Sequence, residues 1–128
     1  MAIATTSKTP ATLLPALERA RLCAKVAFDQ KARDIVIMDM RKITRLYDYF
    51  VLITGNTRRH IHNITEEIDT TLKNAGDHRM SVEGYEASTW VVQDYGDVVV
   101  HVFDSDTRSY YGLEDLWADA PRIDPEIA

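Results

Sequence analysis

The sequence predicts an α/β (α+β) protein in which a mixed β-sheet of about five strands is flanked by helices. Short apolar runs rich in β-branched and aromatic residues alternate with segments whose apolar residues recur at helical spacing. The 128 residues suit one domain of ordinary size. With 45% hydrophobic and 27% charged residues, the composition is that of a soluble globular protein and excludes disordered and collagen-like classes. The single cysteine, Cys23, excludes a disulfide scaffold.

We divide the chain into a flexible N-terminal arm (1–12), a single α/β domain (13–118) and a C-terminal tail (119–128). The arm is polar and rich in Thr, and Pro121 and Pro125 indicate a loose tail. No stretch approaches the roughly 20 apolar residues that a membrane-spanning helix requires, and the start of the chain lacks a strongly basic leader. We therefore expect a cytoplasmic protein that makes no membrane contacts.

The domain begins with a helix and two strands. Within residues 13–30, Leu17 and other apolar residues stand three or four positions apart, with Arg19 and further charged residues between them. This spacing is typical of an amphipathic helix. The runs 34–39 and 48–54 are apolar, short and bounded by charge or Gly, so we expect two buried strands.

The turn after the second of these strands has two interpretations. Apolar residues recur at helical spacing from Ile61 to Leu72, and Asn56 or Thr57 can cap this helix by accepting from a first-turn amide. The same amides, with basic residues beside them, could instead hold an anion. Neither a phosphate-loop nor a dinucleotide-binding glycine pattern is present, so we favour the cap, with the helix ending near Gly76. The alternative anion site comprises Gly55, Asn56, Thr57 and Arg58.

Three more strands and a short helix complete the domain. A weak strand signal at 80–84 is followed by stronger signals at 89–94 and 98–103. The turn residues 95–97 make the last two strands an antiparallel hairpin. The segment 107–117 predicts a short, broken helix, and the chain contains no internal repeat.

Two features of the second half resemble catalytic groups. Asp104 and Asp106 stand at a strand end, where paired carboxylates can hold Mg²⁺, but a strand-end aspartate more often caps the next helix. His101 lies inside an apolar strand on the face of Val99 and Phe103, and we expect a hydrogen-bonded structural histidine. No Ser or Cys carries a nucleophile signature. We therefore assign no catalytic residue, no metal ligand and no cofactor.

Charge is divided unevenly along the chain. Residues 80–128 hold 11 Asp/Glu and only 2 Lys/Arg, whereas the net charge of the whole chain is −5. An acidic surface repels phosphate, so we expect little direct nucleic-acid binding and favour a basic protein partner. The alternative is that the acidic excess merely keeps a small protein soluble. Most of the large aromatic residues lie in the same segment, where they can anchor an interface or fill the core.

Ordered blocks over about residues 34–118 resemble the ribosomal silencing factor, or Iojap-like, family. Seven blocks in the same order are more specific than any single motif. The blocks are Asp34-Ile35 with Asp39, residues 48–51 through Thr54-Gly55, Arg59-His60, residues 82–84, residues 90–92, residues 96–103, and Arg108 with Tyr111, Leu113-Glu114 and Leu116-Trp117.

The resemblance implies a fold related in shape to nucleotidyltransferases. It also implies a factor that binds the large ribosomal subunit on its L-fourteen protein, hinders small-subunit joining and represses translation when nutrients are short. Organelle members are linked to large-subunit assembly. Active nucleotidyltransferases need a carboxylate pair on the strand after the helix, whereas residues 79–84 offer only Glu83. The resemblance therefore implies a fold of this topology without the catalytic carboxylates.

We expect the partner to dock on the acidic, aromatic part of the chain. A face of this kind can self-associate, so a homodimer of the free protein stays open. Two other functions stay open as alternatives: an assembly factor using the same surface, and a nucleotide-binding or nucleotidyltransferase-like enzyme using Gly55, Asn56, Arg58 and the pair Asp104 and Asp106. The predicted partner-binding residues are Glu83, Trp90, Asp94, Asp97, His101, Asp104, Arg108 and Tyr111.

Overall fold

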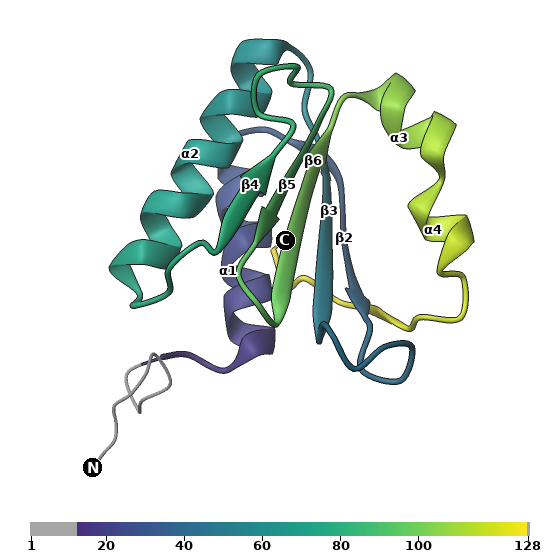
Figure 1. Ribbon diagram of the computed structural model, residues 1–128. Helices are drawn as coiled ribbons and strands as arrows, with labels where there is room; N and C mark the ends of the chain where they lie inside the picture. Colours follow the sequence, from purple (N-terminus) through teal and green to yellow (C-terminus); the bar gives the residue numbers. More distant parts are fainter. Residues whose placement is uncertain (1–12, 128) are drawn as a thin grey trace.

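The structure, a computed structural model, describes residues 13–127, so the predicted N-terminal arm, 1–12, lies outside the described residues. Helices α1 (Ala16–Asp29) and α2 (Arg58–Asn74) lie on one side of a β-sheet, and the short helices α3 (Ser105–Tyr111) and α4 (Leu113–Leu116) stand on the other (Figure 1). The predicted mixed α/β class is confirmed.

The sheet contains six strands in the order β4-β5-β6-β3-β2-β7. The central strands β3 and β6 pair in parallel, and the other neighbouring pairs are antiparallel. The predicted hairpin is confirmed as β5 and β6. The strands are β2 (Arg33–Asp39), β3 (Tyr49–Thr54), β4 (Ser81–Glu83), β5 (Trp90–Asp94), β6 (Val98–Phe103) and β7 (Arg122–Ile123).

The sixth strand corrects our expectation of about five strands and of a loose tail. Strand β7 pairs antiparallel with β2, through Ile37 opposite Ile123 and Met38 opposite Arg122. It contains two residues directly after Pro121, too few to show the alternation that identifies a strand. Its formation depends on the free edge of β2, which is a tertiary property.

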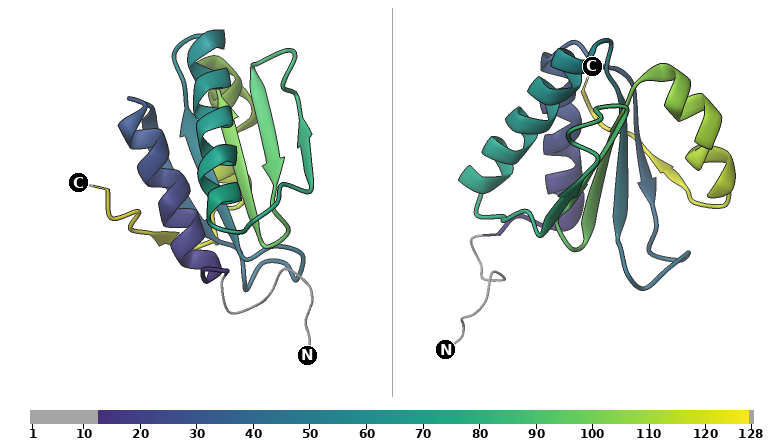
Figure 2. Two further views of the ribbon diagram at one scale, coloured as in Figure 1. Left: turned by 90° about the vertical axis from the view of Figure 1, so that its left-hand side faces the viewer. Right: turned by 45° about the horizontal axis from the view of Figure 1, so that its top comes forward.

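Local sequence explains where the first two helices begin. Helix α1 starts at Ala16, later than predicted, because Pro15 disfavours helical geometry in the residue before it. Helix α2 begins after Thr57, whose hydroxyl accepts from the backbone N–H of His60 at 3.0 Å, as the cap interpretation predicts. The two helices lie side by side over the sheet (Figure 2).

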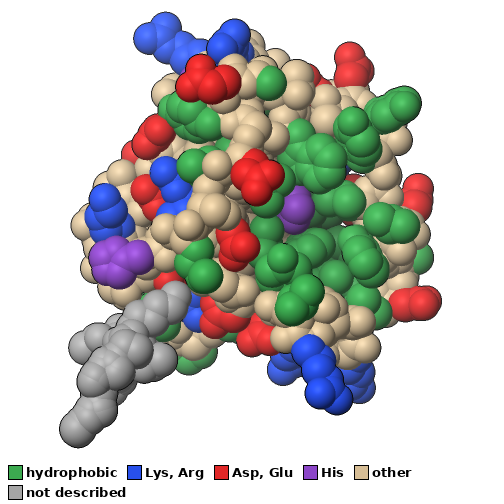
Figure 3. All heavy atoms as spheres, viewed as in Figure 1, with side chains coloured by type: hydrophobic (Ala, Val, Ile, Leu, Met, Phe, Trp, Pro, Cys, Tyr) green, Lys and Arg blue, Asp and Glu red, His purple; other side chains and the backbone are tan. Residues whose placement is uncertain are grey.

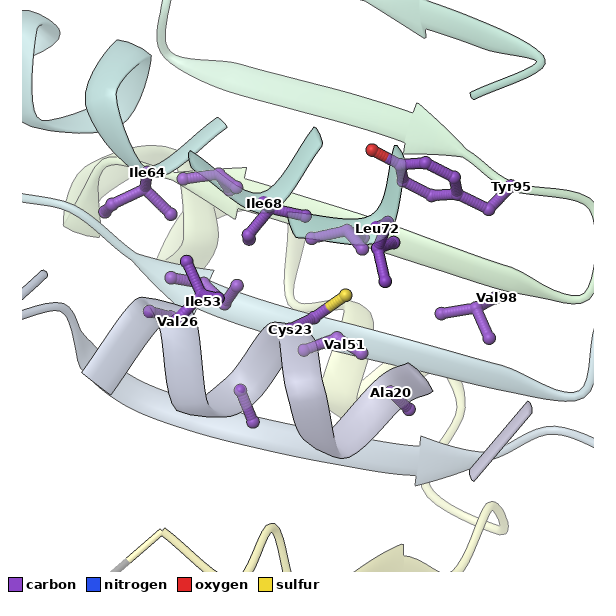
Figure 4. Close-up of a cluster of buried hydrophobic side chains, with 14 of the residues drawn as sticks. Ala20, Cys23, Val26, Val51, Ile53, Ile64, Ile68, Leu72, Tyr95 and Val98 are labelled. Atoms are coloured by element: carbon purple, nitrogen blue, oxygen red, sulfur yellow. The ribbon is translucent and has the colours of Figure 1, made fainter. Parts of the chain in front are cut away.

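Strand residues alternate between two apolar layers. In β6, Val98, Val100 and Val102 face α1 and α2, where side chains from both helices and from strands β2, β3, β5 and β6 converge (Figure 4). Val99 and Phe103 belong to the layer on the other side of the sheet. His101 shares the face of Val99 and Phe103, as predicted, and this face points away from α1 and α2.

Arg19 departs from the amphipathic pattern because it is only 2% exposed. Its guanidinium donates to Asp77 at 2.8 Å and to Asp97 at 2.9 Å, on the side of the sheet that α1 covers. A buried cation needs such partners. The sequence pattern suggested that all charged residues of α1 lie at the surface. Arg19 is an exception.

Candidate docking face

The side of the sheet opposite α1 and α2, which we call the open face, is apolar and only partly covered. Helices α3 and α4 border it, and Leu113 and Trp117 pack against its strands. Figure 3 shows a continuous apolar surface between the strands and these two helices, with acidic groups on several sides. Its strand residues are Phe50 and Leu52 of β3, Trp90 and Val92 of β5, and Val99, His101 and Phe103 of β6.

An aromatic cluster joins α3 to the open face. The ring of Trp90 lies 4.8 Å from Tyr111 and 5.3 Å from Phe103, measured between centroids. Trp90 is half-buried, whereas Tyr111 is 53% exposed and its neighbour Tyr110 is more exposed still. Large aromatic side chains in contact with solvent are typical anchors of protein interfaces.

His101 lies at the centre of β6, opposite Val92 of β5. The indole N–H of Trp90 donates to its Nδ1 at 3.1 Å, and the ring of Phe50 lies 4.8 Å away. Burial lowers the pKa of His101 to about 4, so the imidazole is neutral at neutral pH. A neutral imidazole is compatible with the apolar character of the face.

Two predicted carboxylates lie on the same face. Glu83 stands opposite Val92 and is exposed, and Asp94 stands opposite Val99 and is half-buried. Asp94 also accepts from the N–H of Gly96 at 2.7 Å, which stabilises the β5–β6 turn. The structure thus brings five predicted partner-binding residues together on or beside the open face: Glu83, Trp90, Asp94, His101 and Tyr111.

The other three predicted residues make internal contacts. Asp97 pairs with Arg19 on the helical side, and Asp104 caps α3 by accepting from the N–H of Thr107 at 2.8 Å. This cap explains why α3 begins two residues earlier than predicted. Asp97 therefore does not lie on the open face with the other five.

Arg108 is buried and ties α3 to its surroundings. It donates to the hydroxyl of Thr54 at 2.9 Å, to the carbonyl of Asp34, and to both carboxylate oxygens of Glu114 at 3.0 and 2.9 Å. These hydrogen bonds from Arg108 hold the pKa of Glu114 below its usual value. These contacts give Arg108 a structural role in holding α3 against the sheet.

The contacts of the turn before α2 are those of a helix start. Asn56 accepts from Arg33 Nε at 2.8 Å, and Arg58 donates to the carbonyl of Glu86 at 2.6 Å. A Cβ on Gly55 would lie 2.7 Å from Ile61 Cγ1, so Gly permits close packing of strand and helix here. Packing and capping therefore account for these residues without an anion.

Between residues 13 and 127, no group of three or more His, Cys, Asp or Glu side chains is arranged to hold a metal ion. No helix in the same range is long and apolar enough to cross a membrane.

Sequence reasoning missed the apolar residues of the open face. Phe50 packs against His101 and against Tyr47, whose ring lies 5.6 Å away, and Val92 is half-buried beside them. The run 48–54 is apolar on both sides of the strand, so the sequence carries no signal for which side a helix covers. The adjacent pair Tyr110 and Tyr111, both exposed on a short helix, was the available sign of an apolar surface nearby.

Comparison with known proteins agrees with the sequence resemblance. Residues 14–128 match the family described as "Ribosomal silencing factor during starvation". The ribosomal silencing factor RsfS of Bacillus subtilis is 41% identical over 104 residues, which cover 81% of this chain and 88% of that protein. The mouse "Mitochondrial assembly of ribosomal large subunit protein 1" is 34% identical over 91 residues, covering 69% of this chain and 40% of the relative.

A solved structure supports the same relationship. The crystal structure of a Chromobacterium violaceum protein superposes with a TM-score of 0.80 at 34% identity, covering 82% of this chain and 88% of the other. The family match extends over nearly the whole chain. This chain therefore belongs to the ribosomal silencing factor family.

Proposed function

We propose that this protein binds the large ribosomal subunit through the L-fourteen protein, using the open face, and thereby prevents the small subunit from joining. The observation that carries the proposal is an apolar, partly uncovered sheet face in a member of the silencing family. An ordinary interface of about 800 Å² per partner suffices to exclude another subunit sterically. The action is non-catalytic and represses translation in the cytoplasm under nutrient limitation.

Charge supports a basic protein partner over nucleic acid. Glu83 and Asp94 lie on the open face, and residues 80–128, which supply most of that face, are strongly acidic. Such a surface attracts a basic protein and repels exposed phosphate. Contact with the subunit is therefore made through a protein rather than directly through RNA.

A role in large-subunit assembly is the second candidate. The name of the mouse relative, which states mitochondrial assembly of the large subunit, favours it. The same docking face would serve both roles, which differ in when the factor binds. Binding to mature large subunits would support silencing, whereas binding restricted to immature particles would support assembly.

Sucrose-gradient sedimentation with separated subunits and joined ribosomes tests the proposal. We expect the protein to comigrate with the large subunit alone and to reduce the fraction of joined ribosomes. Binding should weaken at high salt because charge attraction contributes to it. Absence of comigration at both low and high salt would remove the proposed function.

A matched pair of variants tests the use of the open face. Tyr111→Asp places a charge beside Trp90 on that face, and Phe28→Asp changes an aromatic residue of similar exposure, 47%, on the outside of α1. Burying an unpaired carboxylate in an interface is costly. We expect Tyr111→Asp to abolish comigration and Phe28→Asp to preserve it, and equal behaviour of the two would exclude the open face.

A further inference from the structure

The open face contains a polar hydrogen that folding leaves without an acceptor. An indole N–H can only donate, so the bond from Trp90 makes Nδ1 of His101 the acceptor. A neutral imidazole with an unprotonated Nδ1 carries its proton on Nε2. Within residues 13–127, Nε2 has no hydrogen-bond partner, and it is buried. His101 therefore holds a donor that the free protein does not satisfy.

The donor lies on the open face, beneath rings of the same face. His101 is 6% exposed and lies on the side of β6 that α1 and α2 do not cover. The rings packed around it belong to Phe50, Trp90 and Phe103, which are side chains of the same face. Side chains of an interface often change rotamer on binding while the backbone stays in place.

The surroundings restrict the chemistry of the acceptor. The neighbouring rings are aromatic, and a charge buried among them without compensation is costly. Glu83 and Asp94 on the same face repel a carboxylate of the partner. Because burial also keeps the imidazole neutral, no cation on His101 is present to attract an anion. An uncharged oxygen is the acceptor that these conditions favour.

We propose, on the basis of the docking function above, that His101 Nε2–H donates to an uncharged acceptor oxygen of the docked protein. The oxygen belongs to a backbone carbonyl or to a side-chain hydroxyl or amide. A partner that brings this oxygen satisfies the donor, whereas an apolar partner of similar shape leaves it unpaired. His101 is thus a specificity-determining residue at the centre of an apolar interface.

Imidazole NMR tests the proposal directly. In uniformly ¹⁵N-labelled protein, we expect the Nε2 proton of His101 to move downfield and exchange more slowly when purified L-fourteen protein is added. Nδ1 should keep its acceptor shift because Trp90 still donates to it. If other resonances of the open face shift while Nε2–H does not, this proposal fails and the docking function stands. If no resonance shifts, both fail.

The same complex shows whether the acceptor oxygen belongs to the backbone or to a side chain of L-fourteen. With ¹³C only in the backbone carbonyls of L-fourteen, a carbonyl shift that is present with the wild type and lost with His101→Phe assigns a backbone acceptor. A downfield Nε2 proton without such a carbonyl assigns a side-chain hydroxyl or amide. Either result supports the proposal.

Substitutions provide a second test. His101→Phe keeps an aromatic ring but removes the N–H, and we expect affinity to fall about tenfold, the scale of one neutral hydrogen bond. His101→Gln, which retains donor and acceptor groups, should recover part of the loss. Gln93→Leu is the matched control, because Gln93 is a buried polar neighbour in β5 on the helical side. Equal affinity of His101→Phe and wild type, with both folded by circular dichroism, would overturn the proposal.

Discussion

The titration of His101 makes a prediction about stability at the scale of one residue. Burial lowers its pKa to about 4 in the folded protein, against about 6.5 for an unfolded histidine. The unfolded chain therefore binds more protons between these values, so stability is retained above pH 6.5 and lost as pH falls toward 4. Relative to His101→Phe, the wild type should lose about 2 kcal/mol of unfolding free energy between pH 7 and pH 5.

Urea unfolding of both proteins across this pH range measures the effect. Carboxylates that titrate in the same range are common to both proteins, so the difference between the two curves isolates the imidazole. Parallel curves would show that the ring of His101 is accessible to protons in the folded state.

Arg19 makes a second prediction at this scale. Arg19→Met removes the cation beside the buried carboxylate of Asp77, 2.8 Å away, and should cost about 3–5 kcal/mol of unfolding free energy. Arg21→Met is the control, because its ion pair with Glu126 is at the surface, and it should cost less than about 1 kcal/mol. Urea midpoints compare the two, and similar costs would contradict the structural role assigned to Arg19.

At the scale of the element, two variants of Asp104 distinguish its role in capping α3 from a role in binding the partner. Asp104→Ala removes the acceptor for the N–H of Thr107 and should cost about 1 kcal/mol, whereas Asp104→Asn retains a capping oxygen and should cost little. Thermal unfolding checks the two stabilities. In a docking assay, equal weakening by both variants would instead show that the charge of Asp104 contacts the partner, as predicted from the sequence.

The elements themselves were largely predictable because each has a local signal. Helical spacing identified α1 and α2, and apolar runs between turn residues identified β2, β3, β5 and β6. Strand β7 has no such signal, since its two residues are ordered by the edge of β2. The parallel pairing of β3 with β6 joins segments more than forty residues apart, and no local pattern encodes that contact.

The candidate site was predictable only in part for the same reason. Trp90 and His101 stood out as a large aromatic and a polar residue within apolar strands. Asp97 was placed with them because it is acidic and close in sequence, but the cation that it pairs with is Arg19, 78 residues away. Which charges are used internally depends on tertiary contacts that composition does not report.

At the scale of the whole molecule, the location of charge matters more than its total. Glu83→Lys and Glu67→Lys change net charge equally, but Glu83 lies on the open face and Glu67 is an exposed residue of α2 on the other side of the sheet. Electrostatic steering depends on the local field facing the partner and decays within about 10 Å at 0.1 M salt. Glu83→Lys should therefore slow association with L-fourteen several-fold at low salt and reduce its salt dependence. Glu67→Lys should change the association rate and its salt dependence little. Stopped-flow measurements at two ionic strengths compare the two variants. Equal slowing by both would show that net charge, rather than its location, steers association.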